Sequence, residues 1–344
     1  MWDEPPKSVL VIQTAFIGDV VLTIPLLEAI KILWVETELD VMVRPPSDNL
    51  LETLPFIRRV WVYDKRGIER GLCGFLKWRR VLSRQKYDLA IIPQRYLRSA
   101  LLAKSAKIPI RIGFNRGSGR IFHTIVVPYK GYQHEILRNL DLLSPFGPLP
   151  QVDPPVTVPT EEDLHVVNEK LGNSEGKSFA ALAPGSVWFT KRWPEVYYKE
   201  LCRSLMSSGY RVVLIGGAED RALCSRIAAA IGRSALNLAG ELTLRQSVEV
   251  LRRCAFLVTN DSAPTHLGVA AGTRVLTVFG STIPDYGFGP YGAQNRTVGV
   301  EIYCRPCTDH GRKECPEKHF RCLREITPER VFQEIQIMLE QHQA

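Results

Sequence analysis

Short aliphatic runs alternate with amphipathic segments along nearly all of this 344-residue chain, and this alternation constrains the fold more than any other feature. In the first half, residues 8–14 are typical of a buried strand and residues 20–33 of the helix that follows it. Further strands are predicted at 39–43, 60–63, 89–93 and 110–113. Strands that alternate with helices form βαβ units, which place their strands in a parallel sheet. We therefore expect a Rossmann-like α/β unit in this half.

The same alternation returns in the second half, after a proline-rich stretch. Six prolines lie between residues 145 and 159, which indicates a stiff linker. Strands are predicted at 179–183, 211–215, 256–259 and 274–279, and a final helix at 327–342 with Thr327 as its cap. We expect an N-terminal unit at residues 1–150, which the final helix joins, and a C-terminal unit at 160–326.

The positive charge of the chain is concentrated in its first half. The net charge is +8, and residues 44–138 hold 20 Lys and Arg against 6 Asp and Glu. This surplus favours an anionic partner, such as a phosphorylated lipid, an anionic membrane face or a nucleic acid, although it also suits a solvated surface. Nucleic acid is not expected, because no helix-turn-helix, zinc-finger or RNA-binding signature is present. The cations predicted to bind the partner are Arg58, Arg59, Lys65 and Arg66.

Several absent motifs narrow the class of protein. No run of about 18 apolar residues is present, so no membrane span is predicted. Residues 1–6 lack the basic-then-apolar pattern of a secretory leader. No G-x-G-x-x-G follows the first strand, which disfavours a dehydrogenase. Residues 172–178 are similar to a P-loop, but they precede a strand and have one spacer residue too few, so we reject that interpretation.

Ligands of open parallel sheets bind where strands end and loops lead into helices. After the first strand, Asp19 falls near a helix start, where it is either a helix cap or a functional carboxylate. The loop at 183–194 holds Ser186, Thr190 and Lys191 between a strand and a helix, which is the composition of an anion site. The loop at 260–266 is also polar and suits a phosphate and sugar-hydroxyl site. No D-x-D metal motif accompanies these loops.

Four of the eight cysteines lie within 19 residues near the C-terminus, at Cys304, Cys307, Cys315 and Cys322. Four thiolates at this spacing are able to close a tetrahedral structural zinc site, and His310 or His319 could replace one of them. Reduced, packed thiols and disulfides remain as alternatives. In each case we expect the cluster to stabilise the entry to the final helix rather than to take part in chemistry.

Five motifs, taken together and in order, resemble those of one family. They are Phe16-Ile17-Gly18-Asp19, Pro184-Gly185 with Lys191-Arg192-Trp193-Pro194, Asn237-Leu238-Ala239-Gly240, Thr259-Asn260-Asp261-Ser262 with His266, and Phe279-Gly280-Ser281-Thr282. Over essentially the whole chain they resemble the ADP-heptose lipopolysaccharide heptosyltransferases of glycosyltransferase family 9, and the cysteine block is similar to the second type of these enzymes. The resemblance implies a GT-B fold of two Rossmann-like units facing a cleft, with acceptor on the first and donor on the second. It also implies an inverting, metal-independent transfer without a cofactor.

The resemblance assigns roles residue by residue. Asp19 would be the general base for the acceptor hydroxyl, and Lys191 would stabilise the leaving diphosphate, with Ser186 and Thr190 nearby. Asp261 would bind heptose hydroxyls, Ser262 phosphate, and the segment from Asn237 to Glu241 the nucleoside. The chain departs from the family at Ala263-Pro264, where the family has glycine. Pro264 has no N–H, which removes one amide contact there.

These observations predict a heptosyltransferase acting on an anionic lipid A–Kdo core, cytoplasmic and peripherally bound to the inner face of the inner membrane. One alternative is a family 9 enzyme with another donor or acceptor. A second is a sugar-nucleotide-binding protein without catalysis, which the presence of both Asp19 and Lys191 disfavours, because a binder would need no base. A third, a nucleic-acid-binding module, would bind DNA in a salt-sensitive way without transferring a sugar.

Overall fold

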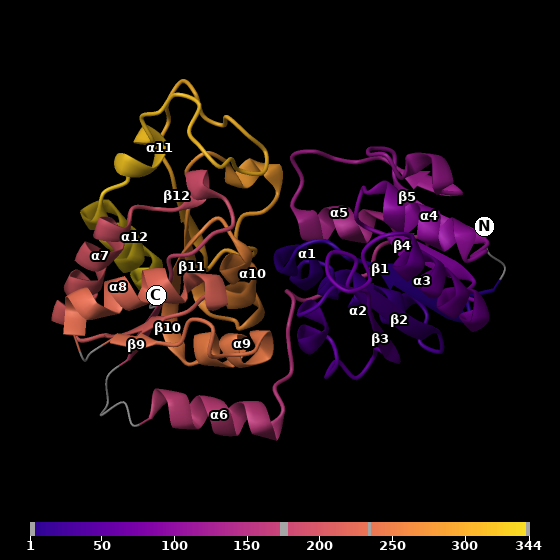
Figure 1. The fold of residues 1–344 in the computed structure, drawn as a ribbon, viewed down its shortest axis with the longest axis horizontal. Coiled ribbons are helices and arrows are strands. Elements are labelled where there is room, and N and C mark those ends of the chain that lie inside the picture. The colour runs from indigo at the N-terminus through magenta and orange to yellow at the C-terminus, as the bar shows by residue number, and fades with distance from the viewer. Residues whose placement is uncertain (1–3, 173–177, 233–234, 342–344) are drawn as a thin grey trace. The chain divides into compact units, whose positions relative to one another are not determined.

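A computed structural model describes residues 4–172, 178–232 and 235–341 of the chain, which forms two compact units, Met1–Val158 and Pro159–Ala344 (Figure 1). Most of the P-loop-like segment, residues 173–177, lies outside the described residues. Within the described ranges, no helix has the length and apolar character needed to cross a membrane.

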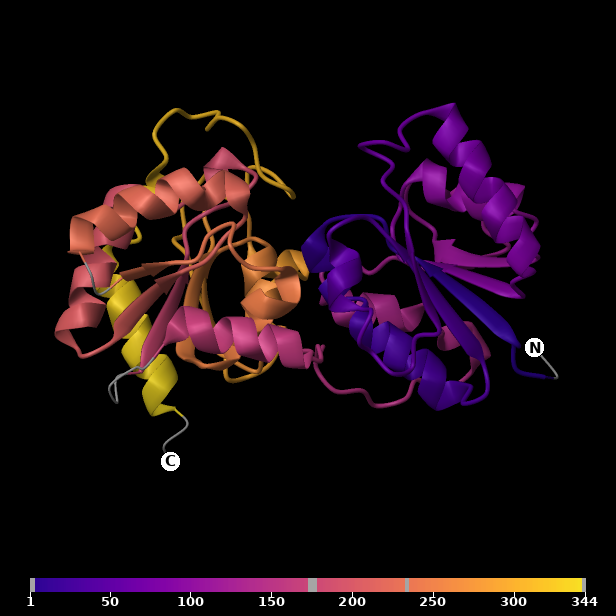
Figure 2. The same cartoon turned by 60° about the horizontal axis from the view of Figure 1, so that its bottom comes forward.

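The first unit is a six-stranded sheet in the order β3-β2-β1-β4-β5-β6, with every neighbouring pair parallel. Its strands are β1 (Ser8–Ile12), β2 (Glu38–Val43), β3 (Arg59–Val62), β4 (Leu89–Ile92), β5 (Ile110–Phe114) and β6 (Ile125–Val127). Its helices are α1 (Ile17–Val21), α2 (Ile24–Leu33), α3 (Leu72–Gln85), α4 (Leu97–Ser105) and α5 (Glu135–Asp141). Helices cover both faces of the sheet (Figure 2), with α2 packed on α5 and α3 packed on α4.

The second unit has the same architecture, in the order β12-β11-β10-β7-β8-β9. Its strands are β7 (Phe179–Ala183), β8 (Arg211–Leu214), β9 (Ala235–Asn237), β10 (Cys254–Asn260), β11 (Arg274–Val278) and β12 (Arg296–Val298). Its helices are α6 (Glu161–Leu171), α7 (Glu195–Ser207), α8 (Arg221–Ile231), α9 (Leu244–Arg252), α10 (Ala263–Ala270), α11 (Arg321–Arg324) and α12 (Pro328–Glu340). The two Rossmann-like sheets predicted from the alternation are therefore confirmed.

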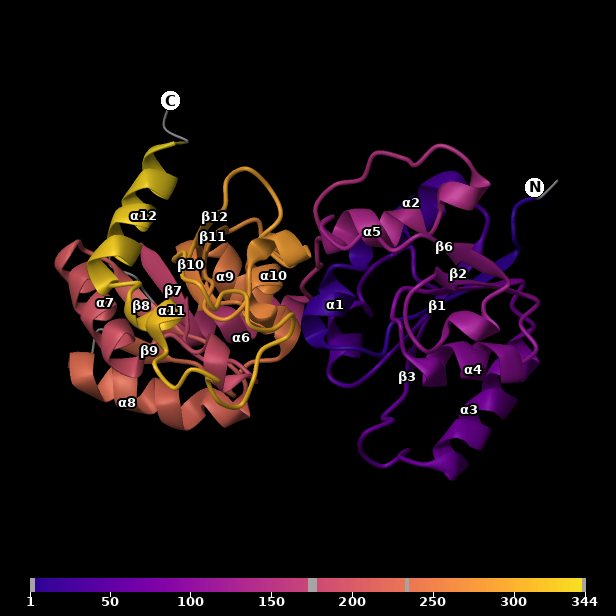
Figure 3. The same ribbon diagram turned by 90° about the horizontal axis from the view of Figure 1, so that it is seen from above.

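The last helix packs differently from our expectation. Helix α12 contacts α7, β11 and β12 of the second unit (Figure 3). Its apolar side, Val331, Ile335 and Met338, is buried in the core of that unit. The Nε1 of Trp193 also donates a hydrogen bond to the carbonyl oxygen of Ile326, just before the helix, at 2.8 Å. The expectation that residues 327–342 join the first unit is wrong, because this apolar stripe finds its partner within the second unit.

Strand order reverses once in each sheet, between β1 and β4 in the first unit and between β7 and β10 in the second. All strands are parallel, so their carboxyl ends meet at one edge of each sheet. The loops on either side of a reversal diverge and leave a crevice, which is where doubly wound folds bind ligands. The fold therefore predicts two ligand sites, one in each unit.

Candidate functional site

The crevice of the first unit lies between the loops that follow β1 and β4. Thr14 follows β1 and Gln94 follows β4, and both side chains are buried. The Nε2 of Gln94 donates a hydrogen bond to the Oγ1 of Thr14 at 2.9 Å, which ties the two loops together. Asp19 lies on α1, the helix that follows the loop after β1, and is partly exposed. The structure therefore places the predicted base at the position where the fold binds ligands.

Asp19 is also a helix cap, as the first of our two interpretations predicted. Its Oδ2 accepts a hydrogen bond from the backbone N–H of Phe16 at 3.0 Å. The two roles are compatible, because a carboxylate has about four acceptor positions and a cap uses only one of them. The cap fixes the orientation of the carboxylate at the crevice.

A buried ion pair lies close to Asp19. Burial raises the pKa of Glu135 to about 7; the charge of Arg138 opposes this rise, and that of Asp19 adds to it. Arg138 is fully buried, and its guanidinium lies 2.6 Å from the carboxylate of Glu135. The electrostatic coupling to Glu135 shows that Asp19 shares its environment with a second titratable group.

Cations surround this crevice at the carboxyl edge of the sheet. The Nζ of Lys65 donates a hydrogen bond to Thr14 at 2.8 Å. Burial lowers the pKa of Lys65 to about 8, helped by the charges of Arg44, Arg66 and Arg98. The Nη1 of Arg44 is buried and has no hydrogen-bond partner among the described residues. Crowded, partly desolvated cations of this kind indicate a site for an anionic ligand.

The structure separates the four cations that we predicted to bind the acceptor. Lys65 and Arg66 follow β3 and lie at the crevice edge, whereas Arg58 precedes β3 and Arg59 is its first residue. Arg58 forms an ion pair with the fully buried Asp40 at 2.7 Å and a second one with Glu38. The charge of Arg58 is thus compensated at the amino end of the sheet, and we withdraw both arginines from the acceptor site.

Several residues of this crevice were not predicted from the sequence. Gln94 and Arg98 follow β4, and Arg44 follows β2. Arg95 also follows β4, and its guanidinium lies over the ring of Tyr129 at 4.6 Å. Their positions directly after predicted strands were a usable signal. What was lacking was the strand order, which makes β1 and β4 neighbours.

The crevice of the second unit is organised by Asn260, at the end of β10. Its side chain is fully buried. Its Oδ1 accepts a hydrogen bond from the N–H of Trp193 at 3.0 Å, and its Nδ2 donates one to the carbonyl oxygen of Pro184 at 2.8 Å. Gly185 approaches Asp220 so closely that an added Cβ would lie 2.1 Å from a carboxylate oxygen. One amide therefore shapes the whole loop after β7, a role that the sequence analysis did not assign.

Lys191 and Asp261 form a nearly buried ion pair at this crevice. The Nζ of Lys191 lies 2.6 Å from the Oδ2 of Asp261, and the two side chains are 12% and 8% exposed. The hydroxyl of Thr282 donates a second hydrogen bond to the same oxygen at 2.6 Å. The loops after β7, β10 and β11 thus bring an ammonium, a carboxylate and a hydroxyl together. This group is able to contact both a phosphate and sugar hydroxyls.

The other residues predicted to bind the donor differ in whether their hydroxyl groups are able to contact a ligand. Ser186 is buried in the same loop, and Ser262 begins α10. The hydroxyl of Thr190 already accepts the N–H of Arg312 at 2.8 Å and the hydroxyl of Ser281 at 3.0 Å. Thr190 therefore supports the loop and has little remaining capacity for a ligand.

The segment after β9 reaches the same edge of the sheet. The N–H of Gly240 donates to the carbonyl oxygen of Gly216 at 3.0 Å, and Asn237 shapes the turn by accepting the N–H of Ala239 at 3.1 Å. Glu241 is exposed, and its carboxylate pairs with Lys170 of α6 at 2.5 Å. The loop position agrees with a nucleoside contact, but the Glu241 carboxylate is engaged elsewhere. Pro264 lies in the first turn of α10, where a helix has no use for its missing N–H.

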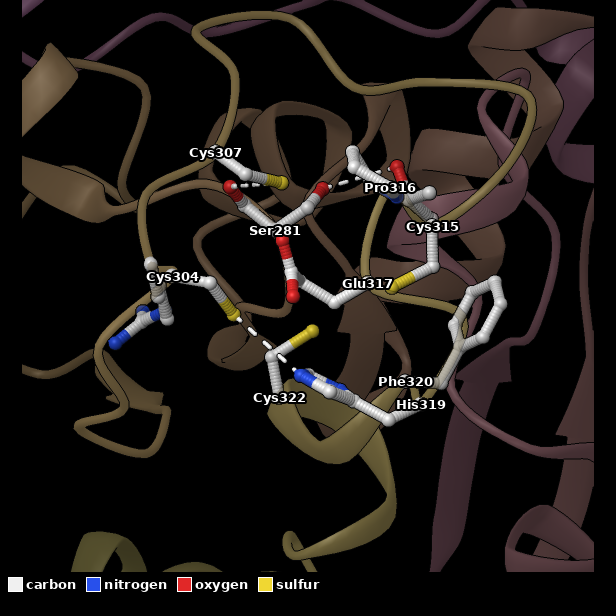
Figure 4. Close-up of a pocket in the computed structure, with 11 residues that line it drawn as sticks. Ser281, Cys304, Cys307, Cys315, Pro316, Glu317, His319, Phe320 and Cys322 are labelled. Atoms are coloured by element: carbon white, nitrogen blue, oxygen red, sulfur yellow. Dashed lines mark hydrogen bonds between the residues drawn. The ribbon is translucent and has the colours of Figure 1, made fainter.

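The four clustered cysteines line one small cavity together with His319 (Figure 4). The cavity has a volume of about 20 Å³, and all four cysteines are free thiols. Burial raises the pKa of Cys322 to about 11, and the neighbouring Cys315, Cys307 and Cys304 add to the shift. Among the described residues, no three His, Cys, Asp or Glu side chains are already arranged around a metal position.

Two doubly wound parallel sheets, each with a polar site where its strand order reverses, define the GT-B class of glycosyltransferases. Within that class, the model of "Glycosyltransferase family 9 (heptosyltransferase)" matches residues 75–320. The chain belongs to this family.

Individual relatives span the whole chain. Lipopolysaccharide heptosyltransferase 2 of Escherichia coli is 27% identical over 98% of this chain and all of its own length. Lipopolysaccharide heptosyltransferase 1 of Pseudomonas aeruginosa is 28% identical over 96% of this chain and 98% of its own. The structure of E. coli ADP-heptose lps heptosyltransferase II superimposes with a TM-score of 0.80 at 26% identity, covering 98% of this chain and all of that one. These identities do not separate the first type of enzyme from the second.

Proposed function

We propose that this protein transfers heptose from ADP-heptose to the phosphorylated Kdo–lipid A inner core, as a heptosyltransferase of the second type. The observation that carries the proposal is that each unit has polar residues in the loops at the carboxyl edge of its sheet: the carboxylate of Asp19 in the first unit, and the ion pair of Lys191 and Asp261 in the second. A non-catalytic binder would need only the second of these. The relatives include a lipopolysaccharide heptosyltransferase and an ADP-heptose lps heptosyltransferase, which supports the choice of donor and acceptor.

In the proposed reaction, Asp19 takes the proton of the acceptor hydroxyl as its oxygen attacks the anomeric carbon of the heptose. The bond from that carbon to the diphosphate oxygen breaks, and its electron pair leaves with ADP. Lys191 stabilises the charge that develops on the diphosphate, while Asp261 accepts hydrogen bonds from heptose hydroxyls. Attack opposite the leaving group inverts the anomeric centre. Lysine supplies positive charge of the kind that a metal gives in other transferases, so we propose that no metal is needed.

On the acceptor side, Lys65, Arg66, Arg44 and Arg98 bind phosphates or carboxylates of the inner core. Such a lipid-linked acceptor implies a protein that works on the cytoplasmic side, bound peripherally to the inner membrane. Ser186, Ser262 and the turn at Asn237 complete the proposed donor site around phosphate and nucleoside.

The test is a transfer assay with two acceptors, one with and one without the first heptose, analysed by mass spectrometry. We expect one added heptose only on the heptose-bearing core. Transfer onto the heptose-free core would identify an enzyme of the first type. Binding of ADP without transfer to either acceptor would point to another donor or to a binding protein.

We also propose that the four-cysteine cluster is a structural zinc site. Four thiols are the soft ligand set that zinc prefers, and a cavity of about 20 Å³ has room for one small ion. The raised pKa of Cys322 means that this thiol stays protonated until a cation compensates its charge. Protein purified without chelator should contain about one zinc per chain, and its removal should lower the unfolding temperature. Four freely titratable thiols with substoichiometric metal would refute the site.

A further inference from the structure

Three exposed aliphatic side chains lie close together on the first unit, on the loop before α3 and on the helix itself. Ile68 is 94% exposed, Leu72 70% and Leu76 45%. Four exposed arginines lie on the same segment: Arg70, Arg79, Arg80 and Arg84. We call these seven residues the α3 face.

The periodicity of α3 separates this face from the core. Leu72 and Leu76 are one helical turn apart, and Arg79 and Arg80 continue the same side toward the end of the helix. Trp78 and Leu82, on the opposite side, are buried against the sheet. The outward side of the helix is therefore apolar at its beginning and cationic beyond.

The loop that carries Ile68 is held firmly. Glu69 is buried, and its Oε2 accepts hydrogen bonds from Trp78 Nε1 at 2.7 Å and from the N–H of Asp64 at 3.1 Å. The carboxylate of Asp64 in turn accepts the N–H groups of Gly67 at 2.8 Å and Ile68 at 3.0 Å. Ile68 projects outward because the residues on both sides of it are fixed.

The position of the loop places the α3 face beside the first crevice. The loop follows the carboxyl end of β3, the same edge at which Asp19 lies. Arg98, which follows β4, anchors it through hydrogen bonds to the Tyr63 hydroxyl at 2.7 Å and to the Gly71 carbonyl oxygen at 2.8 Å. A surface that contacts the beginning of the α3 face therefore also reaches the carboxyl edge of the sheet, where we propose that the acceptor binds.

The charges of this face lack carboxylate partners. Of the described carboxylates, none lies within ion-pair distance of Arg70, Arg79, Arg80 or Arg84, whereas the neighbouring Lys77 is paired with Glu69. Aliphatic side chains followed by uncompensated arginines on one helix side are the composition of helices that lie in the interface of an anionic bilayer. A partner with negative charge above an apolar layer complements both halves of the face.

We propose that the α3 face docks the first unit onto a bilayer containing anionic phospholipids. Ile68, Leu72 and Leu76 enter the boundary between headgroups and acyl chains, and the arginines contact lipid phosphates. This docking deepens the proposed function, because it would bring the crevice to a lipid-linked acceptor. The interaction itself depends only on the surface and needs no donor, acceptor or turnover.

The test measures binding of the full-length protein to vesicles by co-sedimentation. Vesicles of phosphatidylethanolamine with phosphatidylglycerol are compared with vesicles of phosphatidylcholine alone. We expect binding to the anionic vesicles that weakens as salt rises, and at least about tenfold weaker binding of Ile68→Ser/Leu72→Ser/Leu76→Ser. The control is Ile121→Ser, because Ile121 is 76% exposed and belongs to the short turn before β6 rather than to the loop or helix of the α3 face.

The role of the arginines of the α3 face is tested with the double variant Arg70→Glu/Arg80→Glu. Its control is Lys104→Glu/Arg120→Glu, which changes the net charge by the same amount at other exposed positions of the first unit. Only the first pair should lose most of its binding. Equal binding of the serine variant and wild type, or binding to DNA without binding to vesicles, would overturn the proposal. Transfer to an acceptor freed of its lipid chains is measured in parallel: if it fails while vesicle binding persists, only the proposed function is wrong.

Discussion

Replacing Asp19 by Asn separates its two roles, because the structure predicts that one survives and the other does not. The amide oxygen of Asn is able to accept the N–H of Phe16 as Oδ2 does now at 3.0 Å. Asp19 is the third residue of α1, so Asn keeps this hydrogen bond and loses only the favourable interaction of a negative charge with the helix N-terminus, which is about 0.3–1 kcal/mol. We therefore expect the free energy of unfolding to fall by less than about 1 kcal/mol, which is roughly 2–4 °C in the melting temperature of a domain of this size.

The effect on catalysis should be much larger. An amide cannot take a proton from the acceptor hydroxyl, and general-base catalysis typically contributes about 10²–10⁴ in rate. That factor corresponds to about 3–5 kcal/mol in the activation barrier, several times the effect on stability. Binding of ADP should remain within a few-fold of wild type, because the proposed donor residues Lys191 and Asp261 belong to the second unit.

The assay combines initial rates of ADP release in the presence of acceptor, calorimetric titration with ADP, and thermal unfolding. Asp19→Ala is the informative companion, because it removes the cap and the base together and should lose both stability and rate. If Asp19→Asn turned over within about threefold of wild type, Asp19 would be a helix cap only, and the general base would have to be sought elsewhere.

Three further predictions follow from the ion pairs and pKa shifts. Lys191→Ala should lower turnover by roughly 10²–10³ and weaken ADP binding, measured by titration; unchanged values would refute the leaving-group role. Arg58→Ala should lower the free energy of unfolding, measured in urea, by about 1–3 kcal/mol, because it leaves the buried Asp40 without its cation. The lower end of this range allows for the partial exposure of Arg58. The acceptor KM should stay constant. Lys65, with a pKa lowered to about 8, loses its proton as pH rises from 7 to 9, so acceptor KM should rise; Lys65→Arg should flatten that profile.

Most of both sheets could be predicted from the sequence, because long buried strands carry a clear pattern. The strands that went unpredicted, β6, β9 and β12, have three residues each and lie at or next to a sheet edge, which is too short for a pattern to be recognised. The helix predicted at 20–33 is two helices, α1 and α2, separated at Leu22 and Thr23. The apolar stripe of α12 was visible in the sequence, but a stripe does not say which unit will cover it.

The residues of the candidate site also differ in how far local sequence could identify them. Asp19, Lys191 and Asp261 could be proposed as site residues because each follows a strand within a recognisable loop. Thr190 has the right chemistry, but its hydroxyl is used by Ser281 and Arg312, a contact between distant segments that local sequence does not reveal. Arg44 was missed for the same reason, since its neighbours come from other loops.

The position of a charge relative to its strand decides what that charge does in this fold. Arg58 and Lys65 belong to the same basic stretch, yet one precedes β3 and the other follows it. At the amino end, Arg58 compensates the charge of the buried Asp40, and this ion pair stabilises the fold. At the carboxyl end, burial and the neighbouring cations Arg44 and Arg66 disfavour the charged form of Lys65, and a bound anion would offset both effects. A count of Lys and Arg along the sequence therefore overstates the number of cations at the acceptor crevice, whereas cations that follow a strand end, such as Lys65 and Arg66, lie at its edge.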